Sequence, residues 1–427
     1  MTVPFRATPP LESSELARLR RRAIFECCKW DPQVEDTTTI GSFALVLGAD
    51  DWRELTSLAE SLARETLAAE AELATRPELN RMLALPRSVA RVLARRDCAP
   101  TPGIARLIRF DFHHTPDGWR ISEANTDVPG GLNEASGLAE LMAPHFPGTV
   151  PAGDTAGIYC AAILATLPDA PRIALAHATA YTDDRQVMHY VASRLAERGA
   201  RTSLVSPAHL RWNDGRARVD AEWARGALDA VVRFFPGEWL PNLPKRCGWS
   251  NFFGGGATPV SNPGSALLTQ SKRFPLVWDS LRTSLPAWRA MLPETRDPRE
   301  IDGDRDGWVL KPALGRVGED VGIPGVTEST AWKAITRRAS WFPRHWIAQR
   351  RFAPTPLLVE GETFHPCIGV YTVGDRVAGA YGRLARRPLI DWRATDVAVL
   401  VERESAATSA RPVAGSVSRD QLLERSA

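Results

Sequence analysis

The sequence predicts a protein of mixed α/β class, and three patterns in different parts of the chain support this. Residues 11–28 and 52–75 repeat apolar side chains at helical spacing, with Arg and Glu on the opposite faces. From residue 166 onward strands and helices alternate, with "RIALAHA" as a strand, 183–199 as a helix and "ARTSLVSP" as a second strand. Such alternation indicates a parallel α/β unit. Strand-like runs return near the end, among them "HPCIGVYTVGDRVAGAYGRL" with a Gly-Asp turn at its centre.

The composition is that of an ordinary soluble protein. Of the 427 residues, 44% are hydrophobic and 24% are charged, and the formal net charge is +3. This near balance favours neither a nucleic acid nor a membrane surface as a partner. The longest apolar run, "AGIYCAAILATLP", is too short to span a bilayer, and the first residues lack the regions of a signal peptide. The six cysteines have no paired spacing, so we expect reduced thiols in a cytoplasmic protein.

The stretch "RFDFHHTPDGWRISEANTD" predicts a β-hairpin, because two runs rich in aromatic and β-branched residues flank the turn sequence "TPDG". We expect a three-residue loop, Pro116 to Gly118, formed by a type I turn closed by a glycine bulge. Thr115 then lies opposite Trp119. The two histidines beside the turn, His113 and His114, are expected to face solvent.

That register predicts a polar face on the hairpin. Asp111 lies opposite Glu123, and Arg109 lies opposite Asn125, with all four side chains on one face. Two opposed carboxylates repel each other by ~0.2–1 kcal/mol when exposed, so they call for a cation. Asp111→Asn should then leave the ligand-free protein at least as stable. Oxygen ligands alone favour Mg²⁺, which commonly completes its shell with phosphate oxygens. A surface hairpin with scattered charges remains the alternative.

Lysine is rare in this chain, which makes each lysine informative. Of 53 basic residues only five are lysines, at positions 29, 245, 272, 311 and 333. Positions that keep lysine in an arginine-rich chain are candidates for sites that need a compact charge. Lys311 ends a strand and precedes "PALGRVG", which resembles a glycine loop closing over phosphates through Gly315 and Gly318. The loop has no Walker ending, and an ordinary glycine-rich turn remains the alternative.

Taken together, these segments resemble the synthetase part of the glutathionylspermidine synthases, within the ATP-grasp superfamily. The matching segments run in family order over nearly the whole chain; they are "WDPQVEDT", "RFDF...SEANTDVP...NEA", "FFPGEWLP", "NPGSALLTQSK", "VLKPALGRVGEDV", "AQRRF" and "AGAYGRL...DVAVLV". The resemblance implies an ATP-grasp fold preceded by a parallel α/β (pre-ATP-grasp) region. It also implies an ATP-dependent carboxylate–amine ligase, in which ATP phosphorylates a carboxylate and an amine displaces the phosphate.

The resemblance assigns roles by motif position. It implies that the Mg²⁺ ligands are Asp111, Glu123 and Asn125, that Arg109 stabilises charge on the transferring phosphoryl group, and that ATP is held by Lys272, Lys311, Gly315, Gly318 and Gln349. We expect four parts along the chain. They are an N-terminal helical region with the metal-binding hairpin (1–165), the pre-ATP-grasp unit (166–262), the nucleotide-binding lobe (263–402) and a mobile tail (403–427).

Two departures from the family pattern concern the substrates. No amidase domain with a nucleophilic Cys precedes the synthetase, so we expect no hydrolytic activity. Where the glutathione-using synthetases have small hydroxyl residues, this chain has Val128, Pro129 and Gly130. We therefore expect the partners to be small molecules, a peptide or amino acid and an amine, and this segment does not indicate glutathione as the acid.

The amine and the alternative functions are less well defined by the sequence. Three acidic residues, Asp183, Asp184 and Glu238, could contact the amine, although exposed acids are common. A non-catalytic relative that binds ATP or a peptide is the alternative function. The set formed by Arg109 and the three metal-ligand candidates argues against it, because a binding protein has no need of the Arg.

Overall fold

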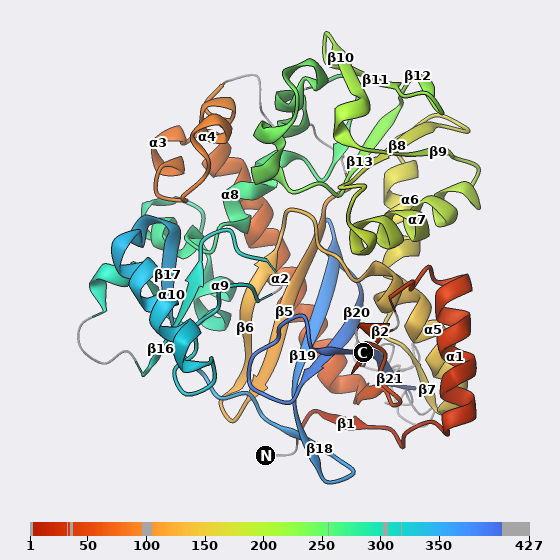
Figure 1. Cartoon of the computed structure of the whole chain (residues 1–427), viewed down its shortest axis with the longest axis vertical. Coiled ribbons are helices and arrows are strands. Elements are labelled where there is room, and N and C mark those ends of the chain that lie inside the picture. The colour runs from red at the N-terminus through yellow and green to blue at the C-terminus, as the bar shows by residue number, and fades with distance from the viewer. Residues whose placement is uncertain are drawn as a thin grey trace, which may run out of the picture.

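A large mixed sheet occupies the centre of the computed structural model (Figure 1), which describes residues 3–31, 33–34, 37–95, 105–254, 256–301, 306–316 and 318–403. Within these residues the sheet has nine strands. Seven follow the order β1-β4-β21-β20-β19-β5-β6, while β18 pairs with β19 and β7 with β21. Their bounds are β1 (Phe5–Ala7), β4 (Leu45–Leu47), β5 (Leu107–Thr115), β6 (Gly118–Asn125), β7 (Thr149–Pro151), β18 (Leu357–Val359), β19 (Glu362–Val373), β20 (Arg376–Ala385) and β21 (Thr395–Glu402).

This central sheet joins strands that are far apart in the sequence. β5 pairs with β19 in antiparallel register, so that Asp111 lies opposite Gly369 and Arg109 opposite Tyr371. A Cβ atom on Gly369 would lie 2.9 Å from the Cδ of Arg109, so glycine leaves the room that this side chain needs. The predicted segments 1–165 and 263–402 thus contribute to one sheet, and their division into domains stays a prediction.

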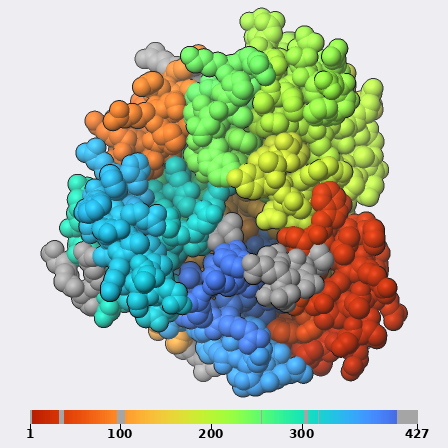
Figure 2. All heavy atoms as spheres, in the orientation of Figure 1, coloured from red at the N-terminus to blue at the C-terminus, as the bar shows by residue number. Residues whose placement is uncertain are grey.

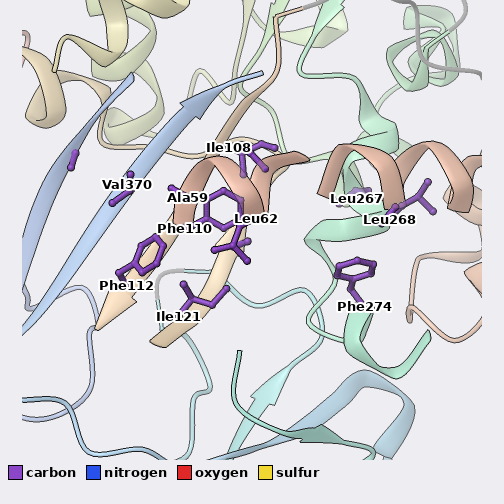
Figure 3. Packing of buried hydrophobic residues seen from close by; sticks show 14 of the residues in the cluster. Ala59, Leu62, Ile108, Phe110, Phe112, Ile121, Leu267, Leu268, Phe274 and Val370 are labelled. Carbon is purple, nitrogen blue, oxygen red and sulfur yellow. The ribbon is translucent and has the colours of Figure 1, made fainter. Parts of the chain in front are cut away.

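Helix α2 (Ala49–Ala74) packs on one face of the central sheet and decides which face remains for a site. Ala59 and Leu62 of the helix belong to the same buried cluster as Ile108, Phe110 and Phe112 of β5 (Figure 3). Because side chains alternate along a strand, the residues between these apolar ones point to the opposite face. The polar residues of β5 therefore face away from the core.

The hairpin was predicted with the wrong loop but with the right register at the polar face. Thr115 pairs with Gly118, so the loop has two residues, Pro116 and Asp117, and the predicted three-residue loop is wrong. The pairing then shifts by one residue between Asp111 and Phe112. Ser122 is the extra residue of this β-bulge. The bulge cancels the shift at the turn, and Asp111 lies opposite Glu123 and Arg109 opposite Asn125, as predicted.

The middle of the chain forms the predicted parallel α/β unit. Its four-stranded sheet has the order β14-β13-β8-β9 and runs parallel throughout. The strands are β8 (Arg172–Ala176), β9 (Arg201–Val205), β13 (Ala230–Arg233) and β14 (Val260–Ser261), with α6 (Thr155–Leu164) and α7 (Thr182–Ala196) beside them. A small antiparallel sheet, formed by β10 (Leu210–Asn213), β11 (Arg216–Asp220) and β12 (Arg225–Ala227), extends this unit.

A third lobe, left of the central sheet in Figure 1, carries the glycine loop. Its antiparallel sheet has the order β15-β17-β16 and packs against helix α10 through a small apolar cluster. The elements are β15 (Thr295–Arg296), β16 (Trp308–Pro312), α10 (Ser329–Trp341) and β17 (Trp346–Arg350). Lys311 lies near the end of β16, as predicted. Of the predicted tail, residues 404–427 lie outside the described part of the chain.

Besides short 3-10 helices, the remaining helices and strands are short, apart from the first helix, which matches the predicted helix at 11–28. They are α1 (Ser13–Glu26), β2 (Gln33–Val34), β3 (Thr37–Thr38), α3 (Pro77–Asn80), α4 (Arg87–Leu93), a π-helix (Glu134–Leu138), α5 (Ala139–Met142), α8 (Leu267–Gln270) and α9 (Pro286–Met291). No helix in the described ranges combines the length and the apolarity that a membrane crossing requires.

Candidate functional site

A cavity of about 1270 Å³ opens over the polar face of the hairpin. Figure 2 shows the hollow near the middle of this side of the molecule, between the lobe coloured cyan and the yellow-green and red segments. Small-molecule sites usually measure ~300–1,000 Å³, so this cavity has room for a nucleotide and further substrates. Among the predicted site residues, those that line it are Arg109, Asp111, Glu123, Asn125, Lys311, Gly318 and Gln349. Lys272 borders a smaller neighbouring pocket.

The two opposed carboxylates are each held by a cation of the chain itself. Arg109 donates to both oxygens of Asp111, with Nε–Oδ1 at 2.6 Å and Nη2–Oδ2 at 3.0 Å. Lys272 Nζ lies 3.0 Å from Glu123 Oε2. The expectation that only a bound ion offsets their repulsion is therefore wrong. Sequence spacing could not reveal Lys272 as the partner, because it lies on a distant segment.

The oxygen atoms of Asp111, Glu123 and Asn125 nevertheless suit a magnesium ion that also binds a nucleotide. Asn125 donates from Nδ2 to Asp111 Oδ2 at 3.2 Å, which leaves its amide oxygen as an acceptor, and Glu123 Oε1 has only a 3.5 Å contact with Asn125. The described residues contain no group of three or more His, Cys, Asp or Glu able to hold a metal. Two carboxylates and an amide thus fit Mg²⁺ when phosphate oxygens supply the other ligands.

The electrostatics of this region depend on two buried lysines. Burial would raise the pKa of Glu123, but Lys272 and Lys311 outweigh that effect and lower it to about 2. Burial lowers the pKa of Lys311 to about 8, with Glu123 opposing the shift and Lys272 adding to it. Glu123 is therefore ionised at neutral pH, and Lys311 is mainly charged. A polyphosphate would meet two compact cations here.

Lys311 is fixed between the hairpin and β17. Its Nζ donates to the carbonyl oxygen of Ser122 at 2.9 Å and to Oε1 of Gln349 at 2.8 Å. Ser122 is the residue that the bulge inserts, so the bulge both corrects the register and supplies this acceptor. Gln349 lies opposite Val309, on the strand beside Lys311. The structure thus brings Lys311 and Gln349 together, and their roles in holding ATP stay a prediction.

The glycine loop is held over the cavity by two cations. Lys272 Nζ donates to the carbonyl oxygen of Gly315 at 2.8 Å. Arg316 makes two bonds to Glu238, at 3.0 and 3.1 Å, and a third to Asp127 Oδ2 at 3.1 Å. Gly318 has a φ of 69°, a conformation that favours glycine. Sequence reasoning missed Arg316, whose only signal was its position inside the loop.

Asp127 anchors this contact from the hairpin side. Its second oxygen pairs with Arg233, and both side chains are completely buried. The backbone N–H of Gly237 donates to Asp127 Oδ2 at 3.0 Å. Burial would raise the pKa of Asp127, but Arg233 and Arg316 outweigh it and lower the pKa. Asp127 is therefore a fixed negative charge that Arg316 can dock against.

One end of the cavity is acidic and contains a lysine that sequence reasoning left without a role. Lys29 Nζ lies 2.6 Å from Glu134 Oε1, 3.0 Å from Asp396 Oδ2 and 3.4 Å from Asp31 Oδ1. Lys29 is one of the five lysines, which was its only signal. The cavity wall there also includes Asp183 and Asp184. Of the three acids suggested for an amine, Glu238 instead pairs with Arg316.

The wall beside Arg109 is largely apolar. Gly130 accepts a hydrogen bond from Arg109 Nη1 at 3.1 Å through its carbonyl oxygen, and Val128 and Phe234 line the cavity next to it. The segment at which this chain departs from the glutathione-using synthetases thus lies at the cavity. It offers methyl groups and backbone there in place of hydroxyl groups.

The expectation that His113 and His114 face solvent is wrong for His113. His113 is buried on β5, with Nδ1 3.1 Å from the carbonyl oxygen of Pro366 and Nε2 3.1 Å from Ser122 Oγ. Burial, and secondarily the charge of Lys311, lower its pKa to about 4. His114 is half-buried, and its Nδ1 contacts Thr355 Oγ1 at 3.0 Å. His113 is therefore a neutral support for the bulge.

Comparison with known proteins defines the family. The model of the glutathionylspermidine synthase pre-ATP-grasp family matches residues 35–402, so the chain belongs to that family. No curated protein matches the chain. Among solved structures, a putative gamma-glutamylcysteine synthetase from Methylobacillus flagellatus KT is similar at 12% identity with a TM-score of 0.44, over 81% of this chain and 87% of that one. The mixed α/β fold agrees with the class that the sequence predicted, and the family model is that of a pre-ATP-grasp family.

Proposed function

We propose that this protein is an ATP-dependent carboxylate–amine ligase that forms an amide through an acyl phosphate and releases ADP. The observation that carries the proposal is the arrangement on one cavity wall of a buried Arg, two carboxylates and an amide, with two lysines beside them. Phosphoryl transfer depends mainly on positioning and on neutralising charge. Such a wall supplies both.

The nucleotide would lie between the third lobe and the hairpin. Lys272 and Lys311 would contact its phosphates, Gly315 and Gly318 would let the loop backbone approach them, and Gln349 would lie beside the base. A magnesium ion, held by Asp111, Glu123 and Asn125, would neutralise phosphate charge when bound. Since both carboxylates are paired with cations in the structure, Arg109 and Lys272 would have to release them in part and turn toward the nucleotide.

Arg109 would act on the reacting groups. Its guanidinium lies 5.4 Å from the ring centroid of Tyr381 and 6.0 Å from that of Tyr371, and these contacts hold it at the cavity wall. From there it would stabilise charge on the transferring phosphoryl group and on the carboxylate that receives it. The apolar surface of Val128 and Phe234 beside it supports an acid substrate other than glutathione, a peptide or an amino acid.

The amine would enter at the acidic end. Asp183 and Asp184 form no ion pair with a Lys or Arg in the described residues. Burial raises the pKa of Asp184 to about 6, although Arg316 opposes the shift. An ammonium group bound here would relieve that unfavourable burial of negative charge. Hence this end favours a cationic acceptor.

The test is turnover by the full chain with ATP, Mg²⁺ and a panel of peptides, amino acids and amines. Phosphorus NMR should detect ADP and phosphate in equal amounts, and mass spectrometry should detect the amide. An Arg109→Met variant should bind ATP yet lose turnover. AMP and pyrophosphate as products would contradict the acyl-phosphate route. ATP binding without turnover under every condition would instead support the non-catalytic relative, in which Arg109 and Lys272 keep the carboxylates paired.

A further inference from the structure

Lys29 occupies the inner part of the acidic end like a bound ammonium ion. Its side chain is 8% exposed, and three carboxylates surround its Nζ, those of Glu134, Asp396 and Asp31, at 2.6 to 3.4 Å. Burial lowers the pKa of Lys29, but these carboxylates outweigh it and raise the pKa well above its usual range. The Lys29 ammonium is therefore a permanent cation. It lies on the loop after α1 and points into a pocket lined mainly by carboxylates.

Glu134 shows that this pocket is not saturated by Lys29. It is 5% exposed and lines the cavity, yet its second carboxylate oxygen, Oε2, has no hydrogen-bond partner in the described residues. A buried carboxylate oxygen without a partner is costly. Burial, partly offset by Lys29, raises the pKa of Glu134. The site thus retains an acceptor for one more donor beside the Lys29 ammonium.

The outer carboxylates have no cation of their own. Asp183 is exposed and Asp184 is half-buried, and both border the same cavity. Burial, with Asp31 adding to it, raises the pKa of Asp183. The acidic end therefore has an inner layer of three carboxylates around Lys29 Nζ and an outer layer, Asp183 and Asp184, without an ion pair to a Lys or Arg in the described residues.

We infer that Lys29 is a specificity-determining residue, whose ammonium takes the inner carboxylates and restricts the acceptor to a short diamine. This inference rests on the proposed ligase function and names the substrate class of its amine site. One nitrogen of the diamine is the nucleophile and must be neutral when it attacks. The other is an ammonium that Asp183, Asp184 and Glu134 Oε2 would bind. A longer triamine carries a further ammonium, which would need the position that Lys29 holds.

The experiment is calorimetric binding of putrescine and of spermidine to the full chain without ATP. We expect the parent to bind putrescine at least about ten-fold more tightly than spermidine. Lys29→Ala should remove that preference or reverse it, because the vacated inner carboxylates accept the additional ammonium. Lys333→Ala, at a lysine on α10 outside the cavity wall, is the matched control and should behave as the parent does.

A second measurement covers the case in which Lys29→Ala folds poorly, since it removes the ammonium from Glu134 and Asp31 and leaves Asp396 with only Arg383, 3.9 Å away. Ethylammonium chloride should then raise the melting temperature of Lys29→Ala by at least about 3 °C more than that of the parent, with sodium chloride as the ionic-strength control. Equal binding of the two amines by the parent, an unchanged preference in Lys29→Ala, or no ethylammonium response would each overturn the inference. Because none of these measurements uses ATP, the ligase proposal stands or fails separately, on ADP release.

Discussion

Lys272 lies between Glu123 and Gly315, with its Nζ 3.0 Å from Glu123 Oε2 and donating to the Gly315 carbonyl oxygen at 2.8 Å. One ammonium group therefore links the hairpin to the glycine loop. A bound triphosphate would compete with both contacts, because it offers stronger anionic acceptors for the same lysine. In the proposed ligase, nucleotide binding and the release of Glu123 for metal binding would thus be coupled through a single side chain.

Lys311→Arg should lower ATP use at least ~10-fold, equivalent to about 1.4 kcal/mol, while folding changes little. Lys311 Nζ is buried between the Ser122 carbonyl oxygen and Gln349 Oε1, and the planar guanidinium does not fit a space made for a compact charge. Steady-state kinetics in ATP, together with a circular dichroism melt, check this. The control is Lys333→Arg on α10. Identical kinetics for Lys311→Arg and the parent would mean that the lysine has no special role.

Asp111→Asn should abolish or severely reduce turnover and destabilise the ligand-free protein by at least about 1 kcal/mol. The hairpin alone led us to expect equal or greater stability, through relief of repulsion. The structure reverses that expectation, because Asp111 receives two bonds from the buried Arg109. Urea unfolding of the variant and the parent measures the change.

Asp279→Asn is the stability control for this experiment, since Asp279 is 92% exposed and pairs with a surface Arg. Mg²⁺ with ATP should raise the melting temperature of the parent much more than that of Asp111→Asn. If Asp111→Asn retains full activity and the full response to Mg²⁺ and ATP, Asp111 is not a metal ligand.

Glu238→Gln should weaken ATP binding several-fold and change the maximal rate less. Arg316 makes its two charge-assisted bonds to Glu238, and an amide accepts only one of them well. The glycine loop then spends more time open, which reduces the population that binds nucleotide productively. Glu362→Gln, in a surface pair with Arg386, is the control with similar chemistry. A drop in the maximal rate with unchanged ATP affinity would argue against a loop contact.

The sequence predicted the correct pairing at the polar face of the hairpin, because the alternation of side chains along a strand is a local rule. It did so through two errors that cancel, the loop length and the missing bulge. The loop is one residue shorter than predicted, and the bulge at Ser122 restores the pairing. A bulge depends on what contacts the strand, and here the inserted carbonyl accepts from Lys311, 189 positions away. The turn sequence alone contains no signal for it.

The acidic end of the cavity could not be predicted from local sequence patterns, because its residues are far apart in the chain. Lys29 is 105 positions from Glu134 and 367 from Asp396, and only the tertiary fold brings them together. Rarity of lysine marked Lys29 as unusual but could not identify its partners. Asp183 and Asp184 were recognised as acids suited to an amine, and the cavity places both on its wall.

Amine binding should strengthen about ten-fold between pH 5 and pH 7 in the parent and change much less in Asp184→Asn. Burial raises the pKa of Asp184 to about 6, so the carboxylate is mostly protonated at pH 5 and mostly ionised at pH 7. The amine stays cationic across this range.

The same carboxylate makes the free energy of unfolding depend on pH. Since the folded-state pKa of Asp184 lies above the unfolded value, Asp184 favours folding most at low pH and loses that contribution as the pH rises through about 6. Binding and stability should therefore change in opposite directions. Calorimetry with putrescine and thermal melts over the same buffers measure both, with Asp320→Asn, at a surface acid paired with Arg338, as the control. A parent whose affinity for putrescine does not change with pH would remove Asp184 from the amine site.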